Sequence, residues 1–440
     1  MPNQAIQAIA LSYNAWLTSE EIIRQKQILL CRNYYEGDQK VPLSARQQEY
    51  LGFSDSGRFC DNHCRTVVDA PAEKMIFQKF TGKDETFTTW ANNLWQSQPH
   101  WGRLYRKVQR SSLRDGEWFV FVDFNNDIRF IPHPRYTDPT AGGSGFGMKA
   151  HYQEDDPDRD LEYVSKRWTE PYTNERGQPD SRQRMNLYYP DRIERYETTA
   201  RSGWTFWTPY SNPQAPAIMP WPLGVIPIVH IQNQDLRSEI WDAIPIQDAI
   251  NKTLLDALAV ADASGFPILT AIGFYPTSDG LEPAADGSNY LKISPGCWIA
   301  TTNQDASIGS IPPSNLDVLL NLHDRLCMEL ARVTDTPLSR LQLTRQVIGA
   351  ETIKASESSL NQKAIDRQDV FGDDWEACLY IARRYANLYQ AAGLDEDASL
   401  EAVWQPTGYS GVVSELEPTP TAKIKEGPRW TPQQEPTPAG

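Results

Sequence analysis

Cysteine is scarce in this chain, with six residues among 440, and the six are scattered along the sequence. So few dispersed thiols argue against a disulfide-stapled scaffold and are typical of proteins made in a reducing compartment. Long apolar runs are also missing, because residues 254–274, the longest apolar stretch, contain Asp256, Asp262 and Pro267. We therefore expect no membrane span. The start of the chain lacks a basic segment followed by an apolar run, so we expect no signal peptide and synthesis in the cytoplasm.

Positive charge is in deficit, with 42 Lys and Arg against 57 Asp and Glu, a formal net charge of −15 and a pI of about 5.0. A protein that grips nucleic acid over a wide surface is usually basic. If this chain contacts DNA, we expect an acidic wall that repels phosphate and lets the duplex slide. A modest negative charge also simply keeps a protein soluble, and charge alone does not separate the two interpretations.

Motifs that hold nucleotides or perform catalysis are missing as well. Residues 142–147 (GGSGFG) precede Lys149, but they fit neither the phosphate-binding loop nor the dinucleotide pattern, and no helix is predicted to follow. A flexible loop is the simpler interpretation, so any mechanical force must come from a partner. No Ser-His-Asp or Cys-His arrangement stands out, and we expect neither an enzyme nor a cofactor.

One short cluster, Cys60-x-x-His63-Cys64, contains residue types that bind zinc. A structural zinc site needs four ligands, usually two pairs at metal-binding spacing. No second pair at such spacing stands elsewhere in the sequence, and His63 and Cys64 are neighbours on a predicted helix. We therefore expect no metal site.

What the sequence does contain is a clear succession of patterns, helical at first. Apolar residues recur at three- and four-residue spacing near the start of the chain, which predicts helices. Gly37 is placed to end the first helix, and the turn Asp115-Gly116 ends the third. The expected helices span residues 5–36, 60–79 and 90–114.

From Glu117 the pattern changes to the two-residue alternation of strands, and the turn at residues 125–127 predicts a β-hairpin. This region has the size of a β-rich domain, about 100 residues. Further strands are expected at residues 162–168, 184–189, 193–198, 203–208 and 226–231.

Helical spacing returns after Ser238, which can cap a short turn, and Pro245 suits the first position of a new helix. Residues 266–313 lose that spacing and predict short strands within loops. A second helix is expected to begin at Ser314, with Asp317 completing a capping box.

A loop and then a long helix over residues 350–391 are expected to follow. The stretch after residue 415 is rich in Pro, Thr and Gln, so we expect it to be disordered or extended.

Six short segments keep the order found in one known family. The sequence resembles the phage portal family, and its SPP1-type branch in particular, over about residues 20–390. The matching segments are residues 32–37 (RNYYEG), 62–69 (NHCRTVVD), 114–117 (RDGE), 187–193 (LYYPDRI), 222–229 (PLGVIPIV) and 348–354 (IGAETIK).

The resemblance implies an α+β portal fold with a helical and β-rich wing, a two-helix stem, a small α/β clip, a tunnel loop and a long crown-side helix. It divides the chain into the wing (1–235), a stem helix (236–264), the clip (265–313), a second stem helix (314–336), the tunnel loop (337–349), the long helix (350–395) and a C-terminal crown and tail (396–440).

The resemblance also implies which residues meet DNA and which pack the stem. Basic and polar side chains in the tunnel region would touch phosphates without reading bases. A surface loop and solvated helix positions are the simpler alternatives. The expected DNA-facing residues are Arg340, Thr344, Arg345, Gln346 and Lys354; the expected acidic lining is Glu239, Asp242, Asp248, Asp256 and Asp262; the expected stem packing is Leu316, Leu319, Leu320, Leu326 and Leu330.

As a portal, the protein would form a homo-oligomeric ring, usually of twelve subunits, at one capsid vertex of a tailed bacteriophage. The ring would conduct double-stranded DNA during packaging and ejection, and would dock the terminase large subunit and later the head–tail adaptor. Major capsid and scaffold proteins are further expected partners, with assembly in the host cytoplasm. Two alternatives stay open: another head–tail connector or minor capsid protein, and an enzyme with a site in the β domain around Trp204, Trp207 and Tyr210.

Overall fold

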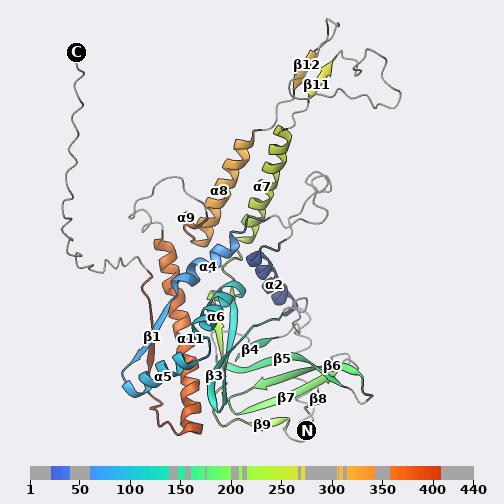
Figure 1. Cartoon of the computed structure of the whole chain (residues 1–440). Helices are drawn as coiled ribbons and strands as arrows, with labels where there is room; N and C mark the ends of the chain where they lie inside the picture. The colour runs from blue at the N-terminus through green and yellow to red at the C-terminus, as the bar shows by residue number, and fades with distance from the viewer. Residues whose placement is uncertain are drawn as a thin grey trace, which may run out of the picture.

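The computed structural model describes residues 21–39, 60–137, 147–153, 160–173, 176–199, 208–210, 216–265, 269–272, 305, 307–310, 315–341 and 357–407. The chain is an α+β protein, as predicted. Figure 1 shows a body of helices and β-sheets from which two helices, α7 (Ile244–Gly265) and α8 (Leu316–Thr334), project side by side. We call these two helices the arm. A two-stranded sheet of β11 (Leu269–Ile272) and β12 (Ser307–Ser310) lies beyond their far ends.

The first described helix, α2 (Ile22–Glu36), ends where the sequence predicts, and its predicted beginning lies outside the described residues. Gly37 takes the left-handed conformation with φ 78°, which suits glycine at a helix end. The predicted second helix is shorter than expected, since α4 (Cys64–Lys74) gives way to strand β1 (Phe77–Gly82). The strand forms because β13 (Leu400–Trp404), far along the chain, pairs with it, and local spacing carries no signal of that contact.

The predicted third helix is in fact two helices, α5 (Glu85–Ser97) and α6 (Trp101–Asp115). Pro99 separates them, because the residue before a proline avoids helical geometry, and Gln98 is extended with ψ 131°. The Gln98 side chain then bonds to two backbone groups of strand β3 (Asp127–His133). The break therefore joins the helices to the neighbouring sheet.

Two antiparallel sheets form the β-rich part. In the first, β2 (Glu117–Asn125) pairs with β3 as the predicted hairpin and with β10 (Ile228–Gln232) on its other edge. The second sheet has the order β4-β5-β6-β7-β8, with β9 also paired to β7. Its strands are β4 (Met148–Tyr152), β5 (Leu161–Thr173), β6 (Pro179–Tyr188), β7 (Arg192–Thr199), β8 (Thr208–Pro209) and β9 (Ile218–Pro220).

Most of the predicted strands are confirmed, with shifted ends. Strand β4 is an addition that the sequence pattern did not predict. The predicted strand at residues 203–208 falls almost wholly outside the described residues.

Strand β2 is buried on both faces. Trp118, Val120 and Val122 pack into the larger core with the helices, whereas Phe119 packs into a second core between the two sheets. Burial on both faces explains why this strand is almost continuously apolar instead of alternating with polar residues.

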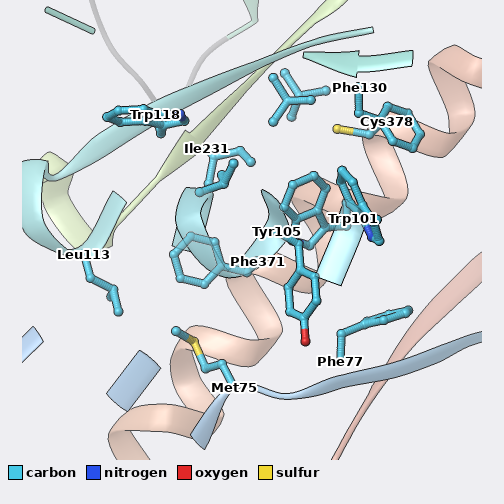
Figure 2. Close-up of a cluster of buried hydrophobic side chains, with 14 of the residues drawn as sticks. Met75, Phe77, Trp101, Tyr105, Leu113, Trp118, Phe130, Ile231, Phe371 and Cys378 are labelled. Atoms are coloured by element: carbon cyan, nitrogen blue, oxygen red, sulfur yellow. The ribbon is translucent and has the colours of Figure 1, made fainter. Parts of the chain in front are cut away.

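The long helix predicted towards the end of the chain is present as α11 (Ser358–Gln390). Figure 2 shows side chains from α6, β1, β3 and α11 converging in the larger core. The Trp101 ring centroid lies 5.2 Å from that of Trp375 and 5.4 Å from that of Phe130. Because aromatic side chains bury large apolar areas, this cluster stabilises the larger core.

Helix α7 starts later than the predicted stem helix. A turn and the short helix η4 (Gln234–Leu236) precede it, so helical geometry begins at Ile244, as Pro245 predicts, instead of at residue 236, where the resemblance places the stem helix. Among the described residues, no helix combines the length and apolar character needed to cross a membrane.

Helix α8 is capped one residue later than expected. The Asn315 side chain accepts a hydrogen bond from the Asp317 N–H at 2.8 Å, so Asn315 takes the capping position assigned to Ser314. A single helical turn, α9 (Leu338–Leu341), occupies the start of the predicted tunnel loop.

The turn at Gly116, between α6 and β2, is sensitive to any side chain. Gly116 has φ 91°, and a Cβ there would lie 2.4 Å from the carbonyl oxygen of Leu236. We expect Gly116→Ala to lower the free energy of unfolding by more than about 1–2 kcal/mol, which is the cost of the left-handed conformation alone. Gly177→Ala is the matched control, since Gly177 has φ 72° and, among the described residues, no atom lies within 4 Å of a Cβ there. Thermal unfolding measures both, and equal losses would argue against the clash.

Candidate functional site

A buried ion cluster fixes the base of the arm to the body. Glu239 lies just before α7, and its carboxylate is 2.6 Å from Lys363 Nζ and 2.9 Å from Arg367 Nη2, both on α11. The Glu239 side chain is 6% exposed. Burial raises the pKa of Glu239, but the two cations outweigh that effect and hold the pKa below its ordinary value. The carboxylate therefore stays ionised and ties the root of the arm to α11.

A second, uncharged contact ties α7 to residues 60–63, the segment before α4. Gln247 and Asn251 lie one turn apart on α7 and are fully buried. Gln247 Nε2 donates to the carbonyl oxygen of Asp61 at 2.6 Å, and Gln247 Oε1 accepts from the N–H of His63 at 3.0 Å. Asn251 Oδ1 accepts from the N–H of Asp61 at 3.0 Å. Two amides thus satisfy three backbone groups of a segment that has no regular structure.

Helix α8 carries exposed apolar side chains on both flanks of its buried face. At 3.6 residues per turn, Val318, Leu322 and Val333 fall within about 60° of one another on one flank. Leu320 and Met328 fall within about 80° of each other on the opposite flank. Their exposed fractions range from 39% for Val333 to 63% for Val318. This helix has more apolar surface than the described part of the chain covers.

The five leucines predicted to pack the stem are divided between the buried face of α8 and one of its exposed flanks. Leu330 is fully buried, and Leu316, Leu319 and Leu326 are half-buried. Leu320 is 44% exposed and belongs to a flank instead.

The acidic residues predicted to line a channel divide into two groups. Asp242 and Asp256 lie towards the surface, where they pair with Arg237 at 2.6 Å and with Lys252 at 3.2 Å. Asp262 belongs to α7, and its side chain is outside the described part of the chain.

The other group faces the body. Glu239 holds α11, and Asp248 Oδ1 accepts a hydrogen bond from the Tyr34 hydroxyl at 2.6 Å. Both carboxylates are engaged in attaching the arm, because each has a buried or half-buried partner in the body. We assign Glu239 and Asp248 to attachment and not to a channel wall.

Of the residues predicted to face DNA, the structure describes Arg340. Its guanidinium lies 2.7 Å from Glu73 Oε2 and 4.0 Å from Glu357 Oε1, so it links α9 to α4 and to the start of α11. The remaining residues, Thr344, Arg345, Gln346 and Lys354, lie outside the described residues.

The aromatic residues considered for a catalytic site are only partly described. Tyr210 lies against the guanidinium of Arg184, 3.9 Å from the ring centroid. This is a packing contact of the second sheet. Trp204 and Trp207 lie outside the described residues.

Comparison with known proteins assigns the chain to a family. The model for the family described as phage portal protein, SPP1 Gp6-like, matches residues 152–408, which is more than half of the chain. This chain belongs to that portal family. The resemblance inferred from six short segments is therefore confirmed. The match includes the arm, α11 and most of the second sheet, but not α4 or the segment before it.

Two curated portal proteins are similar to this one. The portal protein of Mycobacterium phage D29 is 24% identical over 215 residues, which cover 47% of this chain and 42% of that protein. The portal protein of Mycobacterium phage L5 is 24% identical over 196 residues, which cover 42% of this chain and 40% of that protein. The matched part of this chain spans about two fifths of the length of these relatives.

Sequence reasoning missed the residues that attach the arm of the portal. Gln247 and Asn251 interrupt an apolar helical stripe at four-residue spacing, and buried polar groups need partners. Lys363 and Arg367 repeat that spacing on α11. Paired polar residues within a predicted apolar face were the available signal, but the sequence did not show which partners they meet.

We expect Glu239→Gln to destabilise the portal chain by about 3–5 kcal/mol, because two largely buried cations lose the carboxylate that pairs with both of them. Asp242→Asn is the matched control, since its ion pair with Arg237 is about half exposed and worth at most about 1 kcal/mol. Urea unfolding of both variants measures the difference. Similar midpoints for the two variants would contradict the role given to Glu239.

The lowered pKa of Glu239 predicts that the stability of the chain depends on pH. Because the folded-state pKa of Glu239 is lowered, its stabilisation is present above the unfolded-state pKa and is lost as the pH falls through the folded-state value. The stability gap between the native chain and Glu239→Gln should be full at neutral pH and should close in acid. Unfolding midpoints measured across a pH series test this, and a gap that widened in acid would refute it.

Proposed function

We propose that this chain is the subunit of a homo-oligomeric ring, usually of twelve copies in this family, at one vertex of a tailed-phage capsid. The ring forms the channel for double-stranded DNA during packaging and ejection. It docks the terminase large subunit, then the head–tail adaptor, and it contacts major capsid and scaffold proteins during assembly in the host cytoplasm. Family membership supports this proposal, and the apolar flanks of α8 are the observation that carries it.

The parts of the chain take the family's roles in this proposal. The body before α7 is the wing, the arm is the stem, and residues 265–313 are the clip. Residues 337–349 form the tunnel loop, which begins with the single helical turn α9. Helix α11 and β13 continue the wing and crown, and the C-terminal end is a tail.

The flanks of α8 fit a ring because each subunit of a ring has a neighbour on either side. A heterologous contact that closes by rotation pairs one flank of a subunit with a different surface of the next. The exposed side chains of Val318 and Leu322 on one flank, and of Leu320 on the other, would then be covered by neighbouring arms. The arms of such a ring surround a central channel.

The channel wall in this proposal is acidic and holds DNA loosely. Asp242, Asp256 and Asp262 would repel phosphate and keep the duplex mobile. Arg345 and its neighbours in the tunnel loop would touch the backbone without reading bases.

The proposed role is mechanical and structural, with no catalysis and no cofactor, and a partner supplies the force. A small head–tail connector is the alternative that also forms rings. The length of the chain and the two-helix arm favour the portal over such a connector.

Ring formation tests the proposal directly. Negative-stain imaging with mass determination should show closed rings with a central hole and a mass near twelve subunits. Leu322→Glu should reduce the rings to small species, because it places a charge in the apolar contact between arms. Asn321→Glu is the matched control, since this neighbouring position is exposed and already polar. A monomeric native chain, or equal loss in both variants, would overturn the proposal.

Replacing Arg340 and Arg345 together by Ala should lower DNA packaging while rings still form. The amount of DNA protected from nuclease in packaging reactions measures this. Arg65→Ala is the control, because Arg65 is an exposed arginine that pairs with Glu36 between α4 and α2, elements assigned to the wing and not to the stem or tunnel loop. Packaging that stays equal to the control would show that the two arginines do not face DNA.

A further inference from the structure

Four side chains converge where the segment before α4 meets α8. His63, His323 and Cys327 each offer one ligand atom, and these atoms all lie within 4.8 Å of one another. Asp61 joins them, since its Oδ2 is 3.1 Å from His63 Nε2 and 3.2 Å from His323 Nε2. Cys327 Sγ is 3.7 Å from His63 Nε2 and 3.9 Å from His323 Nδ1.

These separations of 3.1–3.9 Å are close to the spacing of ligands around a small tetrahedral ion, to which His323 would give one of its two ring nitrogens. Zinc bonds of about 2.0–2.3 Å place neighbouring ligand atoms about 3.3–3.8 Å apart. Two imidazole nitrogens, a thiolate and a carboxylate oxygen form a donor set typical of zinc and unlike that of magnesium or calcium. We propose that His63, His323, Cys327 and Asp61 bind one zinc ion.

The surroundings hold the ligands in place. His323 and Cys327 lie one helical turn apart on α8, so both point to the same side of that helix. The backbone of Asp61 and His63 is held by the buried amides of α7 described above. Supporting contacts of this kind orient the ligands of metal sites before the ion arrives.

Burial also suits a structural ion. Cys327 has no exposed surface and His63 is 8% exposed, whereas the Asp61 side chain is 35% exposed. The ion would therefore be enclosed on the protein side and reached from the side of Asp61. It would clasp the segment before α4 to α8 and so brace the base of the arm.

The proposed site differs from the Cys60-x-x-His63-Cys64 motif considered in the sequence. Of Cys60, His63 and Cys64, only His63 contributes a ligand. Cys60 Sγ instead lies 2.6 Å from Gln39 Nε2. Besides Asp61, the proposed partners of His63 lie on α8, and His323 stands 262 positions after Asp61. The expectation of no metal site overlooked His323 and Cys327, a second pair four residues apart on α8.

Cobalt binding to the full-length chain tests the proposal. Protein stripped with a chelator is titrated with Co²⁺ while its absorption spectrum is recorded. We expect saturation at one ion per chain, visible bands of tetrahedral cobalt, and a near-ultraviolet thiolate-to-cobalt band, all displaced by Zn²⁺. Absence of saturable binding would overturn the proposal and leave a hydrogen-bonded cluster without metal.

Variants identify the ligands. Cys327→Ser should abolish the thiolate band and weaken Zn²⁺ binding at least about 100-fold. Cys60→Ser is the matched control and should change neither. Loss of the band in Cys60→Ser, with Cys327→Ser unaffected, would overturn the ligand assignment.

A second variant and a second measurement separate metal loss from misfolding. Circular dichroism of the metal-free proteins checks their folding, and the rise in melting temperature on adding Zn²⁺ should disappear in Cys327→Ser. His323→Gln should also lose that rise, and its side chain is 18% exposed, so the change is mild for the fold. A retained rise in both variants would contradict the site. These readouts need no ring, so they stand apart from the test of the portal function.

Discussion

The attachment of the arm to the body by buried polar groups is the constraint on which the rest of this structure depends. The base of the arm contributes Ile250, Cys327 and Leu330 to the larger core, whereas the outer part of the arm projects beyond the body (Figure 1), so packing at the base alone would leave its direction weakly defined. Glu239 with two cations of α11, and Gln247 with Asn251 around the segment before α4, meet their partners in one geometry. Any tilt of the arm would leave buried charges or amides without partners, and such groups are costly. Polar contacts thus specify direction, while the aromatic core supplies most of the stabilisation.

A fixed arm has consequences for assembly. The exposed apolar flanks of α8 act as a contact surface only if every copy presents them at the same angle. A flexible arm would lose conformational entropy on assembly and would weaken the contact. The proposed ring therefore depends on the buried cluster at Glu239 as much as on Leu322 at the surface. The acidic charge of the chain follows the same division, because some carboxylates hold the arm and others, such as Asp242, remain towards solvent.

Sequence reasoning succeeded where the determining physics is local. Gly37 and Gly116 end helices because only glycine accepts their positive φ easily, and the hairpin of β2 and β3 follows from its alternation and turn. It failed where the partner is distant, as in the pairing of β1 with β13, and it overlooked the local signal at Pro99. For the candidate site, the apolar stripe of α8 was predicted, but not which of its leucines are exposed. That distinction depends on the placement of α7, which no pattern within α8 reports.

The cluster of Asp61, His63, His323 and Cys327 lies at the joint between arm and body, where a cross-link has most effect. Both imidazoles point a nitrogen at the same oxygen of Asp61, so without a cation one carboxylate oxygen must serve two donors. A zinc ion at the centre would accept a lone pair from each ligand and would place positive charge beside the Asp61 carboxylate. It would also close a loop of 262 positions, and the entropy that closure removes from the unfolded chain grows with loop length. An ion here would therefore stabilise the folded chain by joining α8 to residues 61–63.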